Sequence, residues 1–356
     1  MKYSIIVGYR NKEINRVKLF LDSLKNQTNS DFELVFVNYF SDTNFQSDIK
    51  AILKNYNLNL NLIDLPPSGK IWNRANCLNI GADQSKNDIL IFTDIDILFE
   101  RNFLEKLDSK VEITNNTVYY YKCFFIDNKF KYDSFFDIDF KMKNLKRHII
   151  KVSGINEKGL SIIPKEVFKR INGFDEYYRI WGFEDLDLFY RMENLKKLNF
   201  YFLSEFDFQT LHQWHPPSKN NIYLPLDWIN FMRNYMNNNK KQIFRERIYS
   251  KKYYDEIDNN TNFVNLNLPA TSPSSISFQL YNFITQYSNK NLFIEFKLTK
   301  TNFVNLLNKL NIRHVNSSIQ YYYESFFYFI LLNEVNWYNY DFLLEKEKIN
   351  LKIIRN

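Results

Sequence analysis

Residues 88–100 read DILIFTDIDILFE, and this stretch decides the fold. Four bulky apolar residues, Ile89 to Phe92, are typical of a buried strand. Two carboxylates, Asp94 and Asp96, follow one residue apart, where the strand gives way to a turn. Carboxylates at this spacing can share one hard cation such as Mg²⁺ or Mn²⁺. An isolated Asp-x-Asp is more often an exposed pair at a strand end, so its context has to decide.

Outward from this stretch, strand patterns alternate with helix patterns. Apolar runs predict strands at 3–9, 32–39, 58–65 and 88–94, and 3.6-residue spacing predicts helices at 13–26, 49–56 and 73–82. This alternation favours βαβ units and a mostly parallel sheet. In such sheets ligands bind beyond the carboxyl ends of the strands. The ends of the first and fourth strands are therefore expected to face one cleft.

The pattern becomes mixed after residue 97 and changes again near residue 240. A helix is predicted at 183–198, with an inward face listed as Leu186, Phe189, Tyr190 and Leu195. The expected fold class is α/β, a mostly parallel central sheet with flanking helices plus a smaller C-terminal α+β region. The expected domains are a catalytic domain at 1–245 and an accessory region of unknown role at 246–356.

Two further groups of residues bear on the chemistry. Glu184, Asp185 and Asp187 cluster where a helix is expected to begin, and the helix dipole favours carboxylates there. His212 and His215 are two of the four histidines in the chain and stand three residues apart. Taken singly, each group has an ordinary structural explanation, as a helix cap or as satisfied histidines.

Four stretches taken together resemble a known family. They are IIVGYRNK (5–12), IWNRANCLNIGA (71–82), IFTDIDILFERN (91–102) and INGFDEYYRIWGFEDLDLFYRM (171–192). In order and spacing they resemble a GT-A fold glycosyltransferase, a Rossmann-like enzyme that uses a nucleotide-sugar donor. The nearest likeness is to the β-1,4-galactosyltransferase family and the related family 2 and chondroitin-polymerase-type domains, across about residues 1 to 220.

The resemblance implies a role for each matching residue. The residues implied for donor binding are Arg10 and Arg74 for uridine diphosphate, Tyr9 and Asn73 for the nucleotide pocket, Asp94 for the ribose or sugar, and Trp181 and Glu184 for the sugar site. Asp185 is the implied general base, and the implied metal ligands are Asp96, His215 and His212. The family usually reads W-G-G-E-D, whereas here Phe183 replaces the second glycine, which reopens the identity of the acceptor.

The implied function is an inverting, metal-dependent transfer of a hexose or N-acetylhexosamine from a UDP-sugar to a glycan or lipid-linked glycan, as in bacterial capsule or lipopolysaccharide synthesis. Mn²⁺ or Mg²⁺ is the expected cofactor, and Mn²⁺ better tolerates histidine. Two alternatives remain open. A nucleotidyltransferase would need a glycine-rich phosphate loop, which VGYRNKE (7–13) is not. A catalytically inactive GT-A domain serving as a glycan or nucleotide binding module would be expected to lack Asp96, Asp185 or the histidines.

Composition restricts partners and location. The net charge is +7, from 47 basic and 40 acidic residues, which suits anionic partners such as nucleotide phosphates or acidic lipids. The basic and aromatic stretch 240–254 is interpreted as a solvated helix face or as a helix touching a membrane surface. No nucleic-acid-binding module accompanies the charge.

Without a signal peptide or a long apolar segment, a cytoplasmic protein, associated at most with the inner membrane face, is expected. Two cysteines form no disulfide framework.

Overall fold

The structure is a computed structural model of the chain. It describes residues 2–137, 141–154, 157–180, 182–216, 226–249, 251–258, 260–268, 273–297, 326, 329–334, 337–345 and 348–355. Within these residues the chain divides into two compact units. The first comprises 1–65 and 71–247, and the second comprises 66–70 and 248–356. Whether the two units are independent domains with a boundary after residue 245 stays a prediction.

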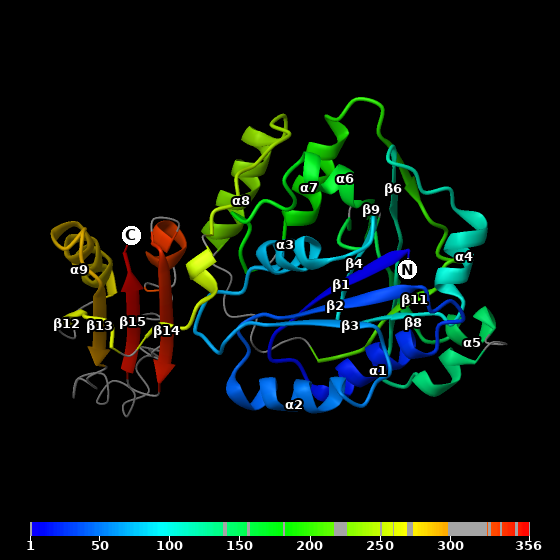
Figure 1. The fold of residues 1–356 in the computed structure, drawn as a ribbon, viewed down its shortest axis with the longest axis horizontal. Coiled ribbons are helices and arrows are strands. Elements are labelled where there is room, and N and C mark those ends of the chain that lie inside the picture. Colours follow the sequence, from blue (N-terminus) through cyan, green and yellow to red (C-terminus); the bar gives the residue numbers. More distant parts are fainter. Residues whose placement is uncertain are drawn as a thin grey trace, which may run out of the picture. The chain divides into compact units, whose positions relative to one another are not determined.

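A seven-stranded sheet forms the centre of the first unit (Figure 1). Its strands in spatial order are β10 (Asn199–Phe202), β6 (Thr117–Tyr120), β9 (Ser161–Pro164), β4 (Ile89–Asp94), β1 (Tyr3–Tyr9), β2 (Phe32–Asn38) and β3 (Leu60–Asp64). Only β9 pairs antiparallel with its neighbours in this sheet. The predicted α/β class with a mostly parallel sheet is therefore confirmed.

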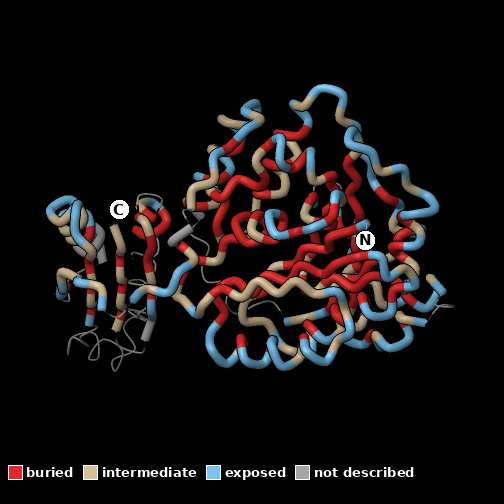
Figure 2. The backbone as a smooth tube through the Cα atoms, viewed as in Figure 1, coloured by how far each residue is buried: buried red, intermediate tan, exposed pale blue. Residues whose placement is uncertain are grey.

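Helices cover both faces of this sheet. On one face lie α1 (Ile14–Lys25) and α2 (Thr43–Leu53), and on the other lie α3 (Arg74–Gln84), α6 (Lys165–Arg170) and α7 (Glu184–Glu193), as Figure 1 shows. Alternation along β1 supplies both cores, since Ile5 packs in the cluster with α1 and Ile6 packs in the cluster with α3. In Figure 2 the central strands β1, β2 and β4 are largely buried while the outer sides of α1 and α2 are exposed.

Two glycines let α3 approach the sheet closely. A side-chain carbon built at Gly81 would lie 2.5 Å from the Ile6 side chain, and one at Gly8 would lie 2.7 Å from the Cys77 sulfur. Neither position therefore accepts a larger residue without movement of a packed neighbour. This contact brings the first residues of α3 to the carboxyl end of β1, where a donor site is expected.

A second, four-stranded sheet belongs to the same unit. Its strands are β5 (Ile97–Phe99), β11 (Thr210–His212), β7 (Phe124–Ile126) and β8 (Ile149–Val152) in spatial order. Here β5 and β11 pair antiparallel, with His212 opposite Ile97. The remaining helical segments of the unit are α4 (Phe103–Lys110), η1 (Tyr132–Phe136), α5 (Met142–Lys146) and α8 (Leu226–Asn239). The sheet thus joins two segments more than a hundred residues apart in sequence.

The described residues of the second unit include a mixed sheet and a long helix. The elements with defined bounds there are η2 (Lys251–Tyr254), β12 (Val264–Leu268), α9 (Pro273–Gln286), β13 (Leu292–Lys297), β14 (Asn339–Glu345) and β15 (Lys348–Ile354). The strand order is β12-β13-β15-β14, with one parallel pair and two antiparallel pairs. The expected smaller C-terminal α+β region is therefore present.

Two details of the sequence interpretation differ from the structure. The predicted inward set of this helix was Leu186, Phe189, Tyr190 and Leu195, and of these Phe189 and Leu195 do pack, partly buried, against the core. The fully buried residues of α7 are instead Glu184, Asp187, Leu188, Arg191 and Met192. Residues 242–249 form no helix, although a helix was expected over 240–254. In each segment an arginine pairs with a buried carboxylate, Arg191 with Asp187 and Arg245 with Asp175. Among the described residues, no helix has the length and apolarity that a membrane crossing requires.

Candidate active site

The turn between β4 and β5 carries the first candidate group. Asp96 lies on this turn, and its Oδ2 is 3.7 Å from Nε2 of His212 and 3.6 Å from Nε2 of His215. One ligand atom from each of the three residues lies within 4.8 Å of the others. The pairing of β5 with β11 produces this proximity, and the Gln213 N–H donates to the Asp96 carbonyl at 2.8 Å. The structure thus brings the three sequence-predicted metal ligands together.

The electrostatics of this cluster suit a cation. Burial disfavours the charged form of Asp96, but the hydrogen bond with His215 and the charges of both histidines outweigh it and hold the pKa of the carboxyl below its usual value. The hydrogen bond with Asp96 raises the pKa of His215. One carboxylate oxygen and two imidazole nitrogens form a donor set that Mn²⁺ accepts more readily than Mg²⁺. The residues present therefore fit a divalent transition-metal ion.

Arg74 organises a second group beside the first. Its Nε lies 2.8 Å from Asp94 Oδ1, its Nη1 lies 3.4 Å from Glu184 Oε1, and its Nη2 donates to the Gly159 carbonyl at 3.2 Å. Arg74 is the first residue of α3, directly after the capping residue Asn73. The Asp94 side chain is 46% exposed, while that of Arg74 is 16% exposed. The Arg74 guanidinium is therefore mostly buried but reaches solvent, and its orientation is fixed by ion pairs with Asp94 and Glu184.

Two adjacent carboxylates at the start of α7 have perturbed acidity. Burial, reinforced by the charge of Asp185, raises the pKa of Glu184 to about 7. Burial also raises the pKa of Asp185, against the opposing effects of Arg74 and of backbone N–H donors. The backbone N–H of Lys158 donates to Asp185 Oδ2 at 3.0 Å. A carboxylate whose pKa is raised toward neutrality is a stronger proton acceptor, as general-base catalysis requires.

The other predicted donor-site residues have different surroundings. Tyr9 is fully buried, and its hydroxyl donates to the Lys12 carbonyl at 2.9 Å. Asn73 is also fully buried, and its side chain accepts from the Asn76 N–H at 2.9 Å. Both residues shape the backbone beneath the site and expose no surface of their own. Arg10 follows β1 and is partly exposed. Trp181 lies outside the described residues.

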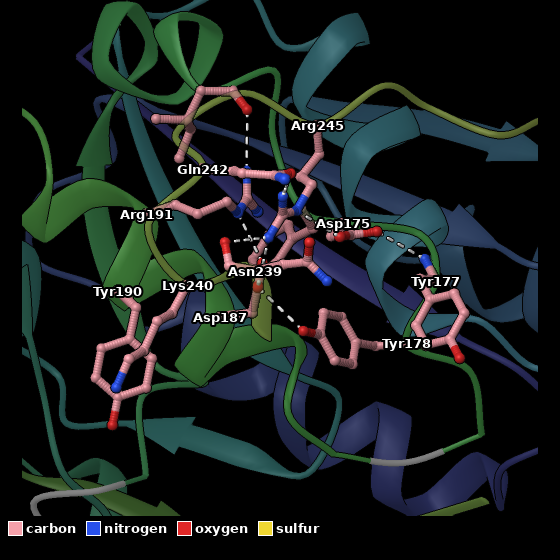
Figure 3. A network of polar contacts seen from close by, with 12 residues as sticks. Asp175, Tyr177, Tyr178, Asp187, Tyr190, Arg191, Asn239, Lys240, Gln242 and Arg245 are labelled. Atoms are coloured by element: carbon pink, nitrogen blue, oxygen red, sulfur yellow. Dashed lines mark hydrogen bonds and ion pairs between the residues drawn. The ribbon is translucent and has the colours of Figure 1, made fainter. Parts of the chain in front are cut away.

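A buried polar network surrounds Asp187 of α7 (Figure 3). Asp187 and Arg191 have fully buried side chains and form an ion pair at 2.7 Å on one face of α7. The Tyr178 hydroxyl donates to Asp187 at 3.0 Å, and Arg245 lies 3.8 Å from Asp187 and 3.0 Å from Asp175. The acidic cluster of the sequence therefore divides, since Asp185 lies near Arg74 whereas Asp187 holds α7 in the core.

Sequence reasoning missed several residues that border these groups. Arg16 Nη1 lies 4.0 Å from Asp96 Oδ2, and the Phe125 ring stacks on His212 with centroids 4.4 Å apart. Lys158 and Gly159 contact Asp185 and Arg74 through their backbone. Nothing in the local sequence marks them, because these contacts depend on pairings between distant segments.

Comparison with known proteins assigns a family and gives weaker structural likenesses. The family Glycosyltransferase like family 2 matches residues 4–270, three quarters of the chain. The crystal structure of S. aureus TarS is similar with a TM-score of 0.47 and 19% identity, covering 67% of this chain and 39% of that chain. The crystal structure of GalNAc-T7 with UDP, GalNAc and Mn²⁺ is similar with a TM-score of 0.46 and 16% identity, covering 60% and 44%. The chain thus spans less than half the length of either protein.

Proposed function

The chain belongs to Glycosyltransferase like family 2, and from this premise we propose a metal-dependent, inverting transfer of a hexose or N-acetylhexosamine from a UDP-sugar to a glycan. One observation carries the proposal: a single turn supplies Asp96 to the Asp/His cluster and Asp94 to the Arg74 cluster. The residues that would stabilise the charge of the diphosphate therefore lie close to Asp185, the proposed base for the acceptor hydroxyl. The likeness to β-1,4-galactosyltransferases stays a prediction.

In the proposed reaction Asp185 accepts the proton of the acceptor hydroxyl as its oxygen attacks the anomeric carbon of the sugar. The bond from that carbon to the diphosphate breaks, and UDP leaves with the electron pair. Arg74 is placed to stabilise the charge that develops on the diphosphate. Asp96, His212 and His215 would hold the metal ion, which when bound supplies further positive charge to the leaving group.

The proposed acceptor is a glycan or lipid-linked glycan of a bacterial surface polysaccharide, such as capsule or lipopolysaccharide. Lys240, Lys241 and the 56% exposed Phe244 are the described residues of the 240–254 stretch best suited to peripheral membrane contact. Arg245 and Arg247 are unsuited to it, because they pair with Asp175 and Asp83. Membership of a glycosyltransferase family argues against the nucleotidyltransferase alternative.

The test is release of UDP from a panel of UDP-sugars with Mn²⁺, with and without EDTA. Release from one donor, lost with EDTA and in Asp96→Ala, is expected and would identify the sugar. Asp88→Ala is the matched control, because Asp88 is an exposed carboxylate at the opposite end of β4. No release from any donor, with no metal-dependent binding of UDP, would favour the inactive binding module instead.

A further inference from the structure

Lys158 lies in a cage of aromatic rings directly beside the proposed base. Its ammonium nitrogen is 4.0 Å from the ring centroid of Phe202, 4.4 Å from that of Phe189 and 5.0 Å from that of Tyr120. Lys158 is only 6% exposed. A cation at such distances from several ring faces is attracted by each ring, and the attraction strengthens as water is excluded. The cage therefore fixes the position of this side chain.

The same residue holds α7 at two successive turns. Its side chain contacts Phe189, while its backbone N–H donates to Asp185 Oδ2 at 3.0 Å. Asp185 and Phe189 are four residues apart, so they lie on one face of the helix, one turn apart. Lys158 thus contacts one face of α7 twice, through its side chain at Phe189 and through its backbone N–H at Asp185.

The next residue extends this link to the donor side. The Gly159 carbonyl accepts from Arg74 Nη2 at 3.2 Å. A side-chain carbon built at Gly159 would lie 3.6 Å from Arg74 Nη2 and 3.8 Å from Asp185 Oδ2, the two nearest residues to it. The backbone of Lys158 and Gly159 therefore contacts both the proposed base, through the Lys158 N–H, and the proposed diphosphate-binding arginine, through the Gly159 carbonyl.

We propose that Lys158 is a positioning residue, whose side chain in the aromatic cage aligns the proposed base Asp185 with Arg74. This inference rests on the proposed function. The Lys158 ammonium lies against three rings, so the proposal gives the side chain a positional role, while the backbone N–H makes the contact with Asp185. The charged groups facing Asp185 are Arg74 of α3 and Glu184 of α7, together with Lys158 itself.

The test compares Lys158→Met, which keeps length and loses the cation, with Lys158→Arg, which keeps the cation. We expect kcat of Lys158→Met to fall by about tenfold to a hundredfold, the loss typical of a small misplacement of reacting groups. Release of the side chain from the cage should displace the backbone N–H of residue 158 from Asp185, which raises the pKa of Asp185, so the acid limb of the kcat/KM profile should move to higher pH. In Lys158→Arg, which keeps the cation, both the loss of kcat and the shift of the acid limb should be smaller. The matched control is Lys25→Met, since Lys25 lies over the Tyr56 ring at 6.0 Å on α1.

A merely structural role would lower the yield of folded protein and leave the acid limb in place. Wild-type kcat in Lys158→Met, or a loss of kcat with an unmoved acid limb, would overturn the proposal. A second measurement needs no substrate: hydrogen–deuterium exchange in residues 184–190 should rise in Lys158→Met and not in Lys25→Met. If the wild type transfers no sugar, the proposed function fails, and this exchange alone decides whether Lys158 positions α7. Unchanged exchange there would refute it.

Discussion

Phe183 adopts a backbone conformation that suits glycine. Its φ is 74°, in the left-handed region, at the position that precedes the first turn of α7. A side chain in this region costs about 1–2 kcal/mol. The Phe183 side chain therefore has a conformational cost at this position, in addition to any effect on the acceptor.

Replacement of Phe183 by glycine should therefore relieve strain. We expect Phe183→Gly to raise the free energy of unfolding by about 1 kcal/mol, measured by urea denaturation. The contact of the Phe183 ring with Arg233, 5.8 Å from its centroid, is lost and offsets part of the gain. Phe183→Ala keeps the strained side-chain carbon and should give no gain. A destabilised glycine variant would show that the ring contributes more than the strain removes.

Glu184 should make stability depend on pH. Its pKa is about 7 in the folded protein against 4.5 as the ordinary value. Between these values the folded state keeps a proton that the unfolded chain has lost, so the free energy of unfolding falls as pH rises through this window. Glu184→Gln should lack this fall and should gain stability relative to the wild type above pH 7.

The measurement is urea unfolding of both proteins across that window. Glu193→Gln is the control, because Glu193 lies on the same helix and is exposed. Parallel stability curves for wild type and Glu184→Gln would contradict the prediction.

At the level of elements, α7 shows why the sequence interpretation succeeded in one respect and failed in another. The helix itself follows from its periodicity, but its buried face contains the ion pair of Asp187 and Arg191. Periodicity of apolar residues cannot reveal a face whose charges are neutralised by partners from other segments, here Arg245 and Tyr178.

Loss of one of these partners should be costly. We expect Arg245→Met to lower the free energy of unfolding by about 3 kcal/mol, since it leaves the buried carboxylate of Asp175 without its cation. Lys241→Met, four residues earlier and exposed, should change it by less than about 0.5 kcal/mol. Thermal and urea unfolding measure both variants. Equal stabilities would mean that the network contributes nothing net.

The strands and the candidate site were predictable to different degrees. Strands β1, β2 and β4 follow from uninterrupted apolar runs, whereas the three candidate metal ligands were implied by the family resemblance. The approach of Lys158 to Asp185 was not predictable, because β6, β9 and β10 bring its cage together from separate segments. Contacts made through backbone atoms leave no residue-type signal.

At the scale of the molecule, residues 66–70 belong to the C-terminal unit although the chain on both sides of them belongs to the first. Asp341 on β14 accepts hydrogen bonds from the Gly69 N–H at 2.7 Å and from the Ser68 hydroxyl at 3.2 Å. This segment leads within a few residues to Arg74. Asp341 therefore anchors Ser68 and Gly69 within the C-terminal unit, a few residues before Arg74 in the sequence.

Removal of this anchor should weaken nucleotide binding. We expect Asp341→Ala to raise the Kd for UDP about fivefold. Without the hydrogen bond, worth about 1 kcal/mol, the segment before Arg74 is less ordered in the free protein, and UDP binding must supply that free energy. Isothermal titration in Mn²⁺ measures the change. Asp258→Ala is the control, since Asp258 bonds only locally to the Asn260 N–H in the contacts described for that loop. An unchanged Kd would separate the two units functionally.

The anchoring of residues 66–70 also has a consequence for biosynthesis. Ser68 and its partner Asp341 are 273 residues apart. At ribosomal rates of about 5–20 residues per second, that interval lasts roughly 14–55 seconds. During this time strands β1 to β4 have left the ribosome and can pair. The loop before Arg74 still lacks its hydrogen-bond acceptor, Asp341. The nascent protein can therefore pair much of its central sheet well before residues 68 and 69 acquire their hydrogen-bond partner on β14.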